Sequence, residues 1–299
     1  LDKGTFAFPS LLFRAFGGSV NGKFKISPPE RGIPVSVDLY LKDISPSLIP
    51  RNMLDTSAID PGLLDLDISF SGSGSFLSAI VKDMSGNTSE KEILRKFWRT
   101  LLKNEYRDPL ARTRAGLRFR LSGMDYKGIR LNKIELDASA SDGNIDLPYF
   151  YASHKNSSLS GTAWLGIDYA DFPVKFSSVL KQADLSEIST KLLSSPGLAE
   201  GPGDVAFSFA GHGRVLSEVE RHIAAVGKRD NPSSLEKLHS ALLFMSEKGL
   251  FRNQFFRSSF SLKTLRAGNV RFDNIFGDMV LDNSFFSDRK STRLNSSHT

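Results

Sequence analysis

Two pairs of glycines stand where a nucleotide-binding loop would be expected, directly after apolar, strand-like segments. Gly72 and Gly74 end the stretch DLDISFSGSG, and Gly211 and Gly213 end the stretch DVAFSFAGHG. A dinucleotide-binding fingerprint requires a third glycine, and a phosphate-binding loop requires Gly-Lys-Ser/Thr. Neither stretch has these residues. We therefore interpret all four as structural glycines, which allow a bulge or a tight exit from a strand into a helix.

The residues that usually carry catalysis or bind metals show no organised spacing. The histidines before residue 288 are His154, His212, His222 and His239, and no two have the H-x-x-x-H spacing of a zinc site. The chain has no cysteine and no G-x-S-x-G nucleophile elbow. Its carboxylates are scattered and form no clear acid–base pair. The sequence thus predicts a protein that is not an enzyme, with no metal and no cofactor.

Phenylalanine dominates the aromatic residues, with 23 Phe against 6 Tyr and 2 Trp. Phe contributes apolar area without a polar tip, which suits an extensive apolar surface or core. The chain is 40% hydrophobic and 24% charged, as in ordinary globular proteins. It contains no apolar run of the length that a membrane-spanning helix needs.

The ends of the chain indicate a fragment. Leu1 in place of Met predicts that the true start is missing. Residues 288–299, DRKSTRLNSSHT, resemble a translated sequencing adapter, so we interpret them as a scar and expect the native protein to continue past Ser287. The scar has three basic residues and one acidic residue, so the net charge of +6 becomes +4 without it. Such a mixed, mildly basic surface argues against a nucleic-acid partner.

The two glycine stretches belong to a longer internal similarity at an offset of 139 residues. Between Gly62 and Ser78, eight of 17 positions are identical to their counterparts at this offset. The identical pairs are Gly62/Gly201, Asp65/Asp204, Ser69/Ser208, Phe70/Phe209, Gly72/Gly211, Gly74/Gly213, Leu77/Leu216 and Ser78/Ser217. This similarity predicts two tandem repeats of about 140 residues, over 1–139 and 140–287, the second truncated.

Each predicted repeat contains strand-like segments, a short helix start at Asp43 or Asp184, and one longer amphipathic segment. The amphipathic segments are SEKEILRKFWRTLLKNEY (89–106) and SSLEKLHSALLFMSEKGL (233–250). Alternation of apolar and polar residues elsewhere indicates antiparallel strands. We expect a mainly β, α+β fold: an elongated, curved antiparallel sheet built from the two repeats, with helices crossing it.

The alternation also predicts that each strand has one apolar face. These apolar positions are candidates for a lipid-binding groove: Leu66, Ile68, Phe70, Leu117, Phe119, Leu121, Val205, Phe207 and Phe209. Two interpretations remain open. The residues form either an ordinary core covered by helices or an apolar face that is only partly covered.

One basic segment, 95–107, interleaves cations and aromatic residues. It is the only candidate for binding nucleic acid, and a solvated helix packed on the sheet accounts for it better. Contact of this helix with a membrane surface is a further alternative. A polysaccharide-binding β-solenoid would favour exposed aromatic platforms, in which this chain is poor.

The order of these elements resembles the C-terminal region of the AsmA family of bacterial envelope proteins. The resemblance rests on Gly143, Gly161, 184–186, 201–213, Ser217 and Gly227, with the same theme at Gly4, Gly22, 43–45, 62–74, Ser78 and Gly86. It covers essentially residues 1–287. One departure is that the segments after Gly86 and Gly227 turn helical, where family members often continue with strands.

The resemblance implies the periplasmic part of a protein anchored in the inner membrane of a Gram-negative bacterium, with the anchor outside this fragment. It further implies a role in outer-membrane biogenesis, with phospholipid acyl chains as partners held in an apolar β-groove. The alternative is a structural β-repeat module of the cell envelope with no lipid cargo.

Overall fold

We analysed a computed structural model of the chain. It describes residues from Thr5 onward, except 28–33, 50–61, 75, 77, 79–81, 83–106, 127–128, 168–171, 192–198, 231–233, 251–253, 268–269, 283–284 and 289–299. The chain forms two compact units. The first comprises Leu1–Tyr126, Arg130–Ala152 and Trp164–Ala170, and the second comprises Lys127–Ile129, Ser153–Ala163 and Asp171–Thr299. The predicted division into 1–139 and 140–287 stays a prediction.

The expected α+β fold, with helices crossing a sheet of two tandem repeats, is wrong. Most of the described residues lie in antiparallel strands, and within each unit the strands follow one another in chain order. The described helices lie in the connections between strands. The physical reason is that period-two alternation runs through nearly every segment, so consecutive strands pair directly and need no crossover helix.

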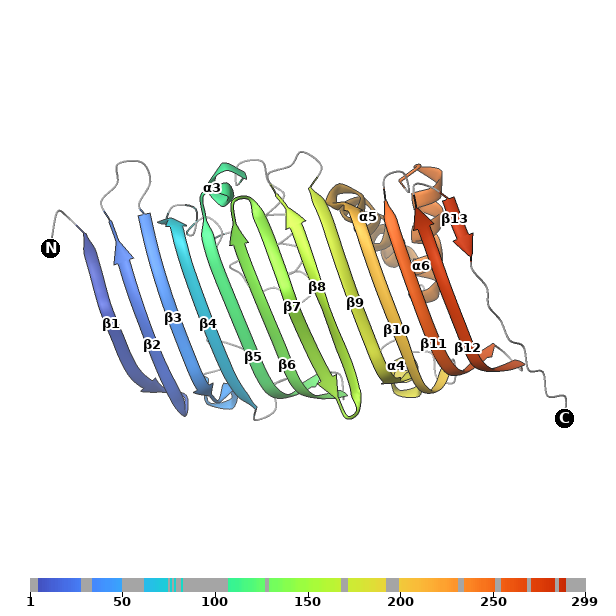
Figure 1. The fold of residues 1–299 in the computed structure, drawn as a ribbon, viewed down its shortest axis with the longest axis horizontal. Coiled ribbons are helices and arrows are strands. Elements are labelled where there is room, and N and C mark those ends of the chain that lie inside the picture. Colours follow the sequence, from blue (N-terminus) through green and yellow to red (C-terminus); the bar gives the residue numbers. More distant parts are fainter. Residues whose placement is uncertain are drawn as a thin grey trace. The chain divides into compact units, whose positions relative to one another are not determined.

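The first unit contains β1 to β5 and most of β6 and β7, with β1 to β5 side by side in Figure 1. The strands are β1 (Phe6–Ala15), β2 (Gly18–Ile26), β3 (Pro34–Ile44), β4 (Leu63–Ser73), β5 (Arg114–Tyr126), β6 (Ile129–Ser141) and β7 (Asn144–His154). Tight two-residue turns join two of the hairpins. Phe16 and Gly17 both have positive φ, as do Asp142 and Gly143, which gives the turn twist that hairpins favour.

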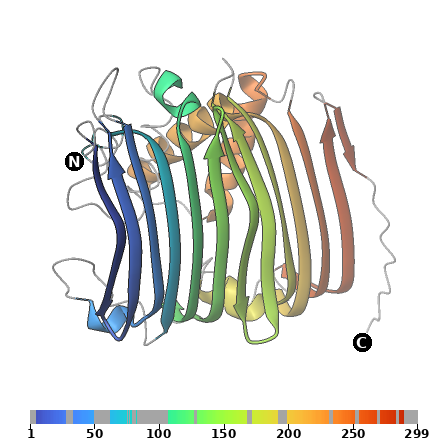
Figure 2. The same cartoon turned by 60° about the vertical axis from the view of Figure 1, so that its left-hand side comes forward.

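The described part of the second unit contains most of β8, all of β9 to β13 and three helices. The strands are β8 (Ser157–Gly166), β9 (Pro173–Asp184), β10 (Ala199–His212), β11 (Phe255–Ala267), β12 (Val270–Asp282) and β13 (Phe285–Asp288). The helices are α4 (Leu185–Lys191), α5 (Gly213–Asp230) and α6 (Ser234–Glu247). Figure 1 shows α5 and α6 on one side of β9 to β12, and Figure 2 shows the same elements turned by 60°.

Local sequence explains where the helices begin and end. Asp184 caps α4, because its Oδ1 accepts hydrogen bonds from the backbone N–H groups of Ser186 and Glu187. After α6, Gly249 has a φ of +63°, and Leu250 donates back to the carbonyl of Met245 at 2.8 Å. This is the glycine-terminated end that releases the chain toward β11.

Several sequence expectations can be compared with these elements. The helix predicted over 233–250 is confirmed as α6. The short helix starts at Asp43 and Asp184 lead into a 3-10 turn, η2 (Pro46–Leu48), and into α4. The helix predicted over 89–106 lies outside the described residues, which resume with α3 (Arg107–Ala111). Asp288, the first residue of the interpreted scar, belongs to β13, and 289–299 lie outside the described residues.

Candidate functional site

The strand register gathers the apolar side chains of β1 to β5 on one face of the first unit. Directly opposite residues in antiparallel strands share a face, so the pairing defines rows across the strands. We call these rows the apolar face. They are Phe6, Ile26, Val35 and Gly72; Phe8, Phe24, Val37, Phe70 and Ala115; Leu11, Gly22, Leu39, Ile68 and Leu117; and Phe13, Val20, Leu41, Leu66 and Phe119.

A β-bulge in β1 keeps this face continuous. Phe8 and Leu11 are three residues apart and would point to opposite faces of a regular strand. They pair with Phe24 and Gly22, which are only two apart, so β1 carries one extra residue at this point. The bulge therefore returns Leu11 and Phe13 to the same face as Phe6 and Phe8.

A second bulge, in β3, does the same for Ile44. Leu41 pairs with Leu66 and Ile44 pairs with Leu64, so β3 carries one extra residue between them. Asp43 lies in this bulge with a φ of +56°, and its backbone N–H donates to Asp65 Oδ1 at 2.8 Å. The carboxylate thus satisfies a backbone donor that the strand pairing leaves without a partner.

The apolar face is buried at parts of two margins and only partly open between them. Ile44 and Leu121 are 0% and 4% exposed at one margin, and Val35 is 8% exposed at the other. Between these margins Val20 is buried at 7%, most of the other side chains are half-buried, and those of β1 are exposed, with Phe8 at 49% and Leu11 at 47%. The three rows that begin at Phe8, Leu11 and Phe13 span about 13 Å along the strands. The open apolar strip therefore runs across the strands.

The second unit has its own apolar positions along β10. Val205, Phe207 and Phe209 alternate on one face and are half-buried. The Phe207 ring meets Phe256 of β11 edge-to-face at 5.0 Å, and it meets Phe176 of β9 at 5.7 Å with the planes tilted by 60°. Phe209 pairs with Phe176 on one side and Phe256 on the other. An aromatic cluster thus covers three neighbouring strands.

The structure places the predicted groove residues as follows. Leu66 is directly opposite Phe119, Ile68 is opposite Leu117, and Phe70 is opposite Ala115, whereas Leu121 is buried at the margin. The other three candidates, Val205, Phe207 and Phe209, belong to the aromatic cluster of the second unit. Sequence reasoning missed the contribution of β1, because the bulge breaks the alternation at Pro9 and Ser10; the excess of Phe in this segment was the available signal.

Three of the four structural glycines lie where other groups approach closely. A Cβ at Gly72 would lie 2.8 Å from Thr113 Oγ1, and one at Gly211 would overlap the side-chain amide of Gln254. A Cβ at Gly213 would lie 2.9 Å from the carbonyl oxygen of Phe172. Gly213 begins α5 directly after β10, and Gly74 is helical directly after β4. A tight strand-to-helix exit therefore occurs at both places.

Two of the histidines, His154 and His222, make contacts that hold elements together. His154 Nε2 lies 2.9 Å from Glu187 Oε2, and Lys155 Nζ lies 2.9 Å from the same oxygen. Lys155 donates a hydrogen bond to the Glu187 carboxylate, and this bond raises the pKa of Lys155. His222 Nε2 lies 2.9 Å from Ser240 Oγ, and its ring stacks on Phe244, which joins α5 to α6. Among the described residues, no group of three His, Asp or Glu side chains could hold a metal ion.

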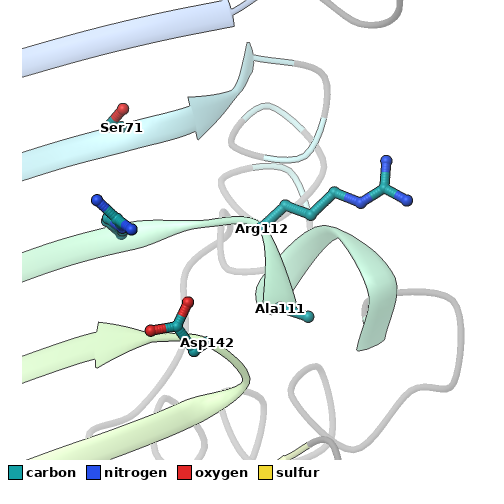
Figure 3. Close-up of a pocket in the computed structure, with 5 residues that line it drawn as sticks. Ser71, Ala111, Arg112 and Asp142 are labelled. Atoms are coloured by element: carbon teal, nitrogen blue, oxygen red, sulfur yellow. The ribbon is translucent and has the colours of Figure 1, made fainter.

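A small polar hollow of about 310 Å³ lies beside the ends of β4 and β5. It is lined by Ser71, Ala111, Arg112, Arg114 and Asp142, and Figure 3 shows the Arg112 side chain extending away from Ser71 and Asp142. Because the hydroxyl and the two labelled charged groups do not converge on one point, we assign no ligand to it.

No helix in the described part of the chain is long and apolar enough to cross a membrane. The chain matches no protein-family model, no curated protein and no solved structure. The site therefore has to be interpreted from its own geometry, which is that of an antiparallel β-protein with a partly open apolar face.

Proposed function

We propose that this protein binds phospholipid acyl chains on its apolar face and is not an enzyme. The observation that carries the proposal is the set of four in-register apolar rows over β1 to β5, which are partly open and most exposed along β1. All side chains in these rows are apolar or absent, as at Gly22 and Gly72. A ligand on this face would be held by apolar burial alone.

The energetics of such a ligand are favourable. Each buried methylene contributes about 0.8 kcal/mol, so ten methylenes contribute roughly 8 kcal/mol before the cost of ordering the chain. Exposed patches of contiguous apolar side chains are uncommon on monomeric proteins and usually mark an interaction site. An acyl chain fits because it presents no polar group that would need a partner on this face.

The sequence resemblance to the AsmA family supports a setting for this activity. We propose that the chain is the periplasmic part of an AsmA-like protein of a Gram-negative inner membrane, involved in phospholipid traffic during outer-membrane biogenesis. Phospholipid is then the partner, and no cofactor takes part.

Two adjacent leucines of β1 offer a matched test. Leu11 lies on the apolar face opposite Gly22, and Leu12 lies on the other face opposite Asn21 and is 73% exposed. We expect Leu11→Asp together with Leu117→Asp to abolish binding of a fluorescent phosphatidylethanolamine, and Leu12→Asp to leave it intact. Native mass spectrometry of each variant, purified from a Gram-negative host, measures co-purified phospholipid independently.

Equal loss in the Leu12→Asp variant, or folded wild-type protein that takes up no lipid, contradicts the proposal. The second result would favour a structural β-module of the envelope. Circular dichroism and a cooperative urea transition for each variant separate loss of binding from loss of folding.

A further inference from the structure

The opposite face of the first unit carries a hollow of about 380 Å³ above a row of small side chains. Ser69 of β4 is directly opposite Gly116 of β5, and Ser139 of β6 also lines the hollow. A Cβ at Gly116 would lie 2.7 Å from Ser69 Oγ, so the missing side chain creates space. The volume lies within the range of small-molecule sites.

One side of this hollow is a row of alternating charges. Arg118 lies opposite Asp67, with Nη1 and Oδ2 3.9 Å apart, and its Nε donates to Asp137 Oδ1 at 3.1 Å. All three side chains remain 40–54% exposed, so each keeps hydrogen-bonding capacity toward a ligand. The row offers acceptors at both ends and a donor in the middle.

Two rings stand at the ends of the hollow. Tyr40 is directly opposite Asp67 and is 46% exposed, and Pro148 lines the far side. A half-exposed tyrosine ring offers an apolar surface for stacking beside polar groups.

We propose that this hollow binds a neutral glycan. Each sugar hydroxyl can both donate and accept a hydrogen bond. Adjacent hydroxyls can therefore donate to the carboxylates of Asp67 and Asp137 and accept from the guanidinium of Arg118 between them. The hydroxyls of Ser69 and Ser139 can donate and accept as well. The apolar face of a sugar ring would stack on Tyr40. A strongly anionic ligand would meet Asp67 and Asp137, and a cationic ligand would meet Arg118 between them. The polar groups of the hollow and the apolar face belong to opposite faces of the same strands. Ile68 and Leu117 of the apolar face also line the hollow, so the glycan test uses variants at other residues.

Arg118 and Arg120 provide a matched pair of variants. Both belong to β5, both have 54% exposed side chains, and both form ion pairs, but only Arg118 lines the hollow. We would titrate the full chain with maltohexaose, cellohexaose and chitohexaose by calorimetry and saturation-transfer NMR. At least one should saturate in the millimolar range or below, and Arg118→Ala should weaken it by about tenfold or more, whereas Arg120→Ala should not.

Tyr40→Ala should weaken the same binding, and Tyr40→Phe should retain it, since the ring face and not the hydroxyl is required. The proposal is overturned if none of the three oligosaccharides saturates. It is also overturned if Arg118→Ala and Arg120→Ala have equal effects, or if only spermidine or a heparin fragment binds at this hollow.

Discussion

The backbone N–H of Asp43 donates to the carboxylate of Asp65 at 2.8 Å, and the same arrangement occurs 139 residues later between Gln182 and Asp204 at 2.7 Å. Asp43 and Gln182 both have positive φ, and each lies in a bulge with one extra residue opposite the following strand. In each unit, the carboxylate of Asp65 or Asp204 thus accepts a hydrogen bond from the backbone of a strained bulge.

We expect Asp65→Ala to lower the free energy of unfolding by about 1–2 kcal/mol, because the bulge donor then loses a charged acceptor. Asp67→Ala is the control: Asp67 is two residues along the same strand but contacts Arg118 only at 3.9 Å, with both side chains well exposed. Urea denaturation measures both. Equal effects of the two substitutions would show that the bulge needs no carboxylate.

Gly211→Ala should destabilise the second unit by about 1–3 kcal/mol, since its Cβ would overlap Gln254, which is 2% exposed. Gly72→Ala should cost less, because a Cβ there approaches Thr113 Oγ1 no closer than 2.8 Å and the Phe70 ring no closer than 3.1 Å. Thermal unfolding compares the two. Adding Gln254→Ala to Gly211→Ala should recover part of the loss, and a purely additive effect would rule out this overlap as the cause.

Because the carboxylate of Asp184 caps α4, we expect its protonation at acid pH to lower the free energy of unfolding. The hydroxyl of Ser186 and the backbone N–H groups of Glu187 and Ser186 lower the pKa of Asp184 below its ordinary value. Because the folded pKa is the lower one, the stabilisation is present above the unfolded pKa and is lost as pH falls through the folded pKa.

Asp184→Asn should therefore flatten the pH dependence of the unfolding free energy below about pH 4 while keeping a cap acceptor. Asp184→Ala should lower stability by about 1 kcal/mol at neutral pH. Urea titrations between acid and neutral pH test both variants. An unchanged acid profile in Asp184→Asn would remove Asp184 as the source of this linkage.

The edge-to-face contact of Phe207 and Phe256 should be worth more than the area that it buries. A double-mutant cycle with Phe207→Leu and Phe256→Leu should give a coupling energy of about 0.5–1.5 kcal/mol. Unfolding measurements on the four proteins provide it. A coupling near zero would mean that the two rings contribute only by burial.

Alternation of residue types was sufficient to locate β4, β5 and β10 and to identify which of their side chains share a face. It could not place Phe8 and Leu11 on one face, because the extra residue in the bulge reverses which positions of β1 point to that face. The bulge itself depends on the pairing of β1 with β2. It also overestimated the helices. Amphipathic spacing correctly predicted α6, but the predicted crossing of the sheet depended on tertiary contacts that local spacing does not determine.

The hollow at Gly116 was not foreseen for a related reason. Its lining comes from β3 to β7, and only the register brings Tyr40, Asp67 and Arg118 into one row. The small number of tyrosines and tryptophans had argued against an aromatic platform for sugars. The strand register nevertheless places one tyrosine, Tyr40, at the end of the charged row that borders the hollow.

The bulge in β1 has a consequence for solubility. Among the described strands β1 is outermost; it has ten residues, most of them apolar and exposed, and an edge of this kind is a template for uncontrolled pairing with other chains. Pro9 lacks a backbone donor, and the bulge beside it interrupts the regular spacing of the groups along the edge. The irregularity that keeps the phenylalanines on one face thus also makes this edge a poor seed for fibrillar aggregation.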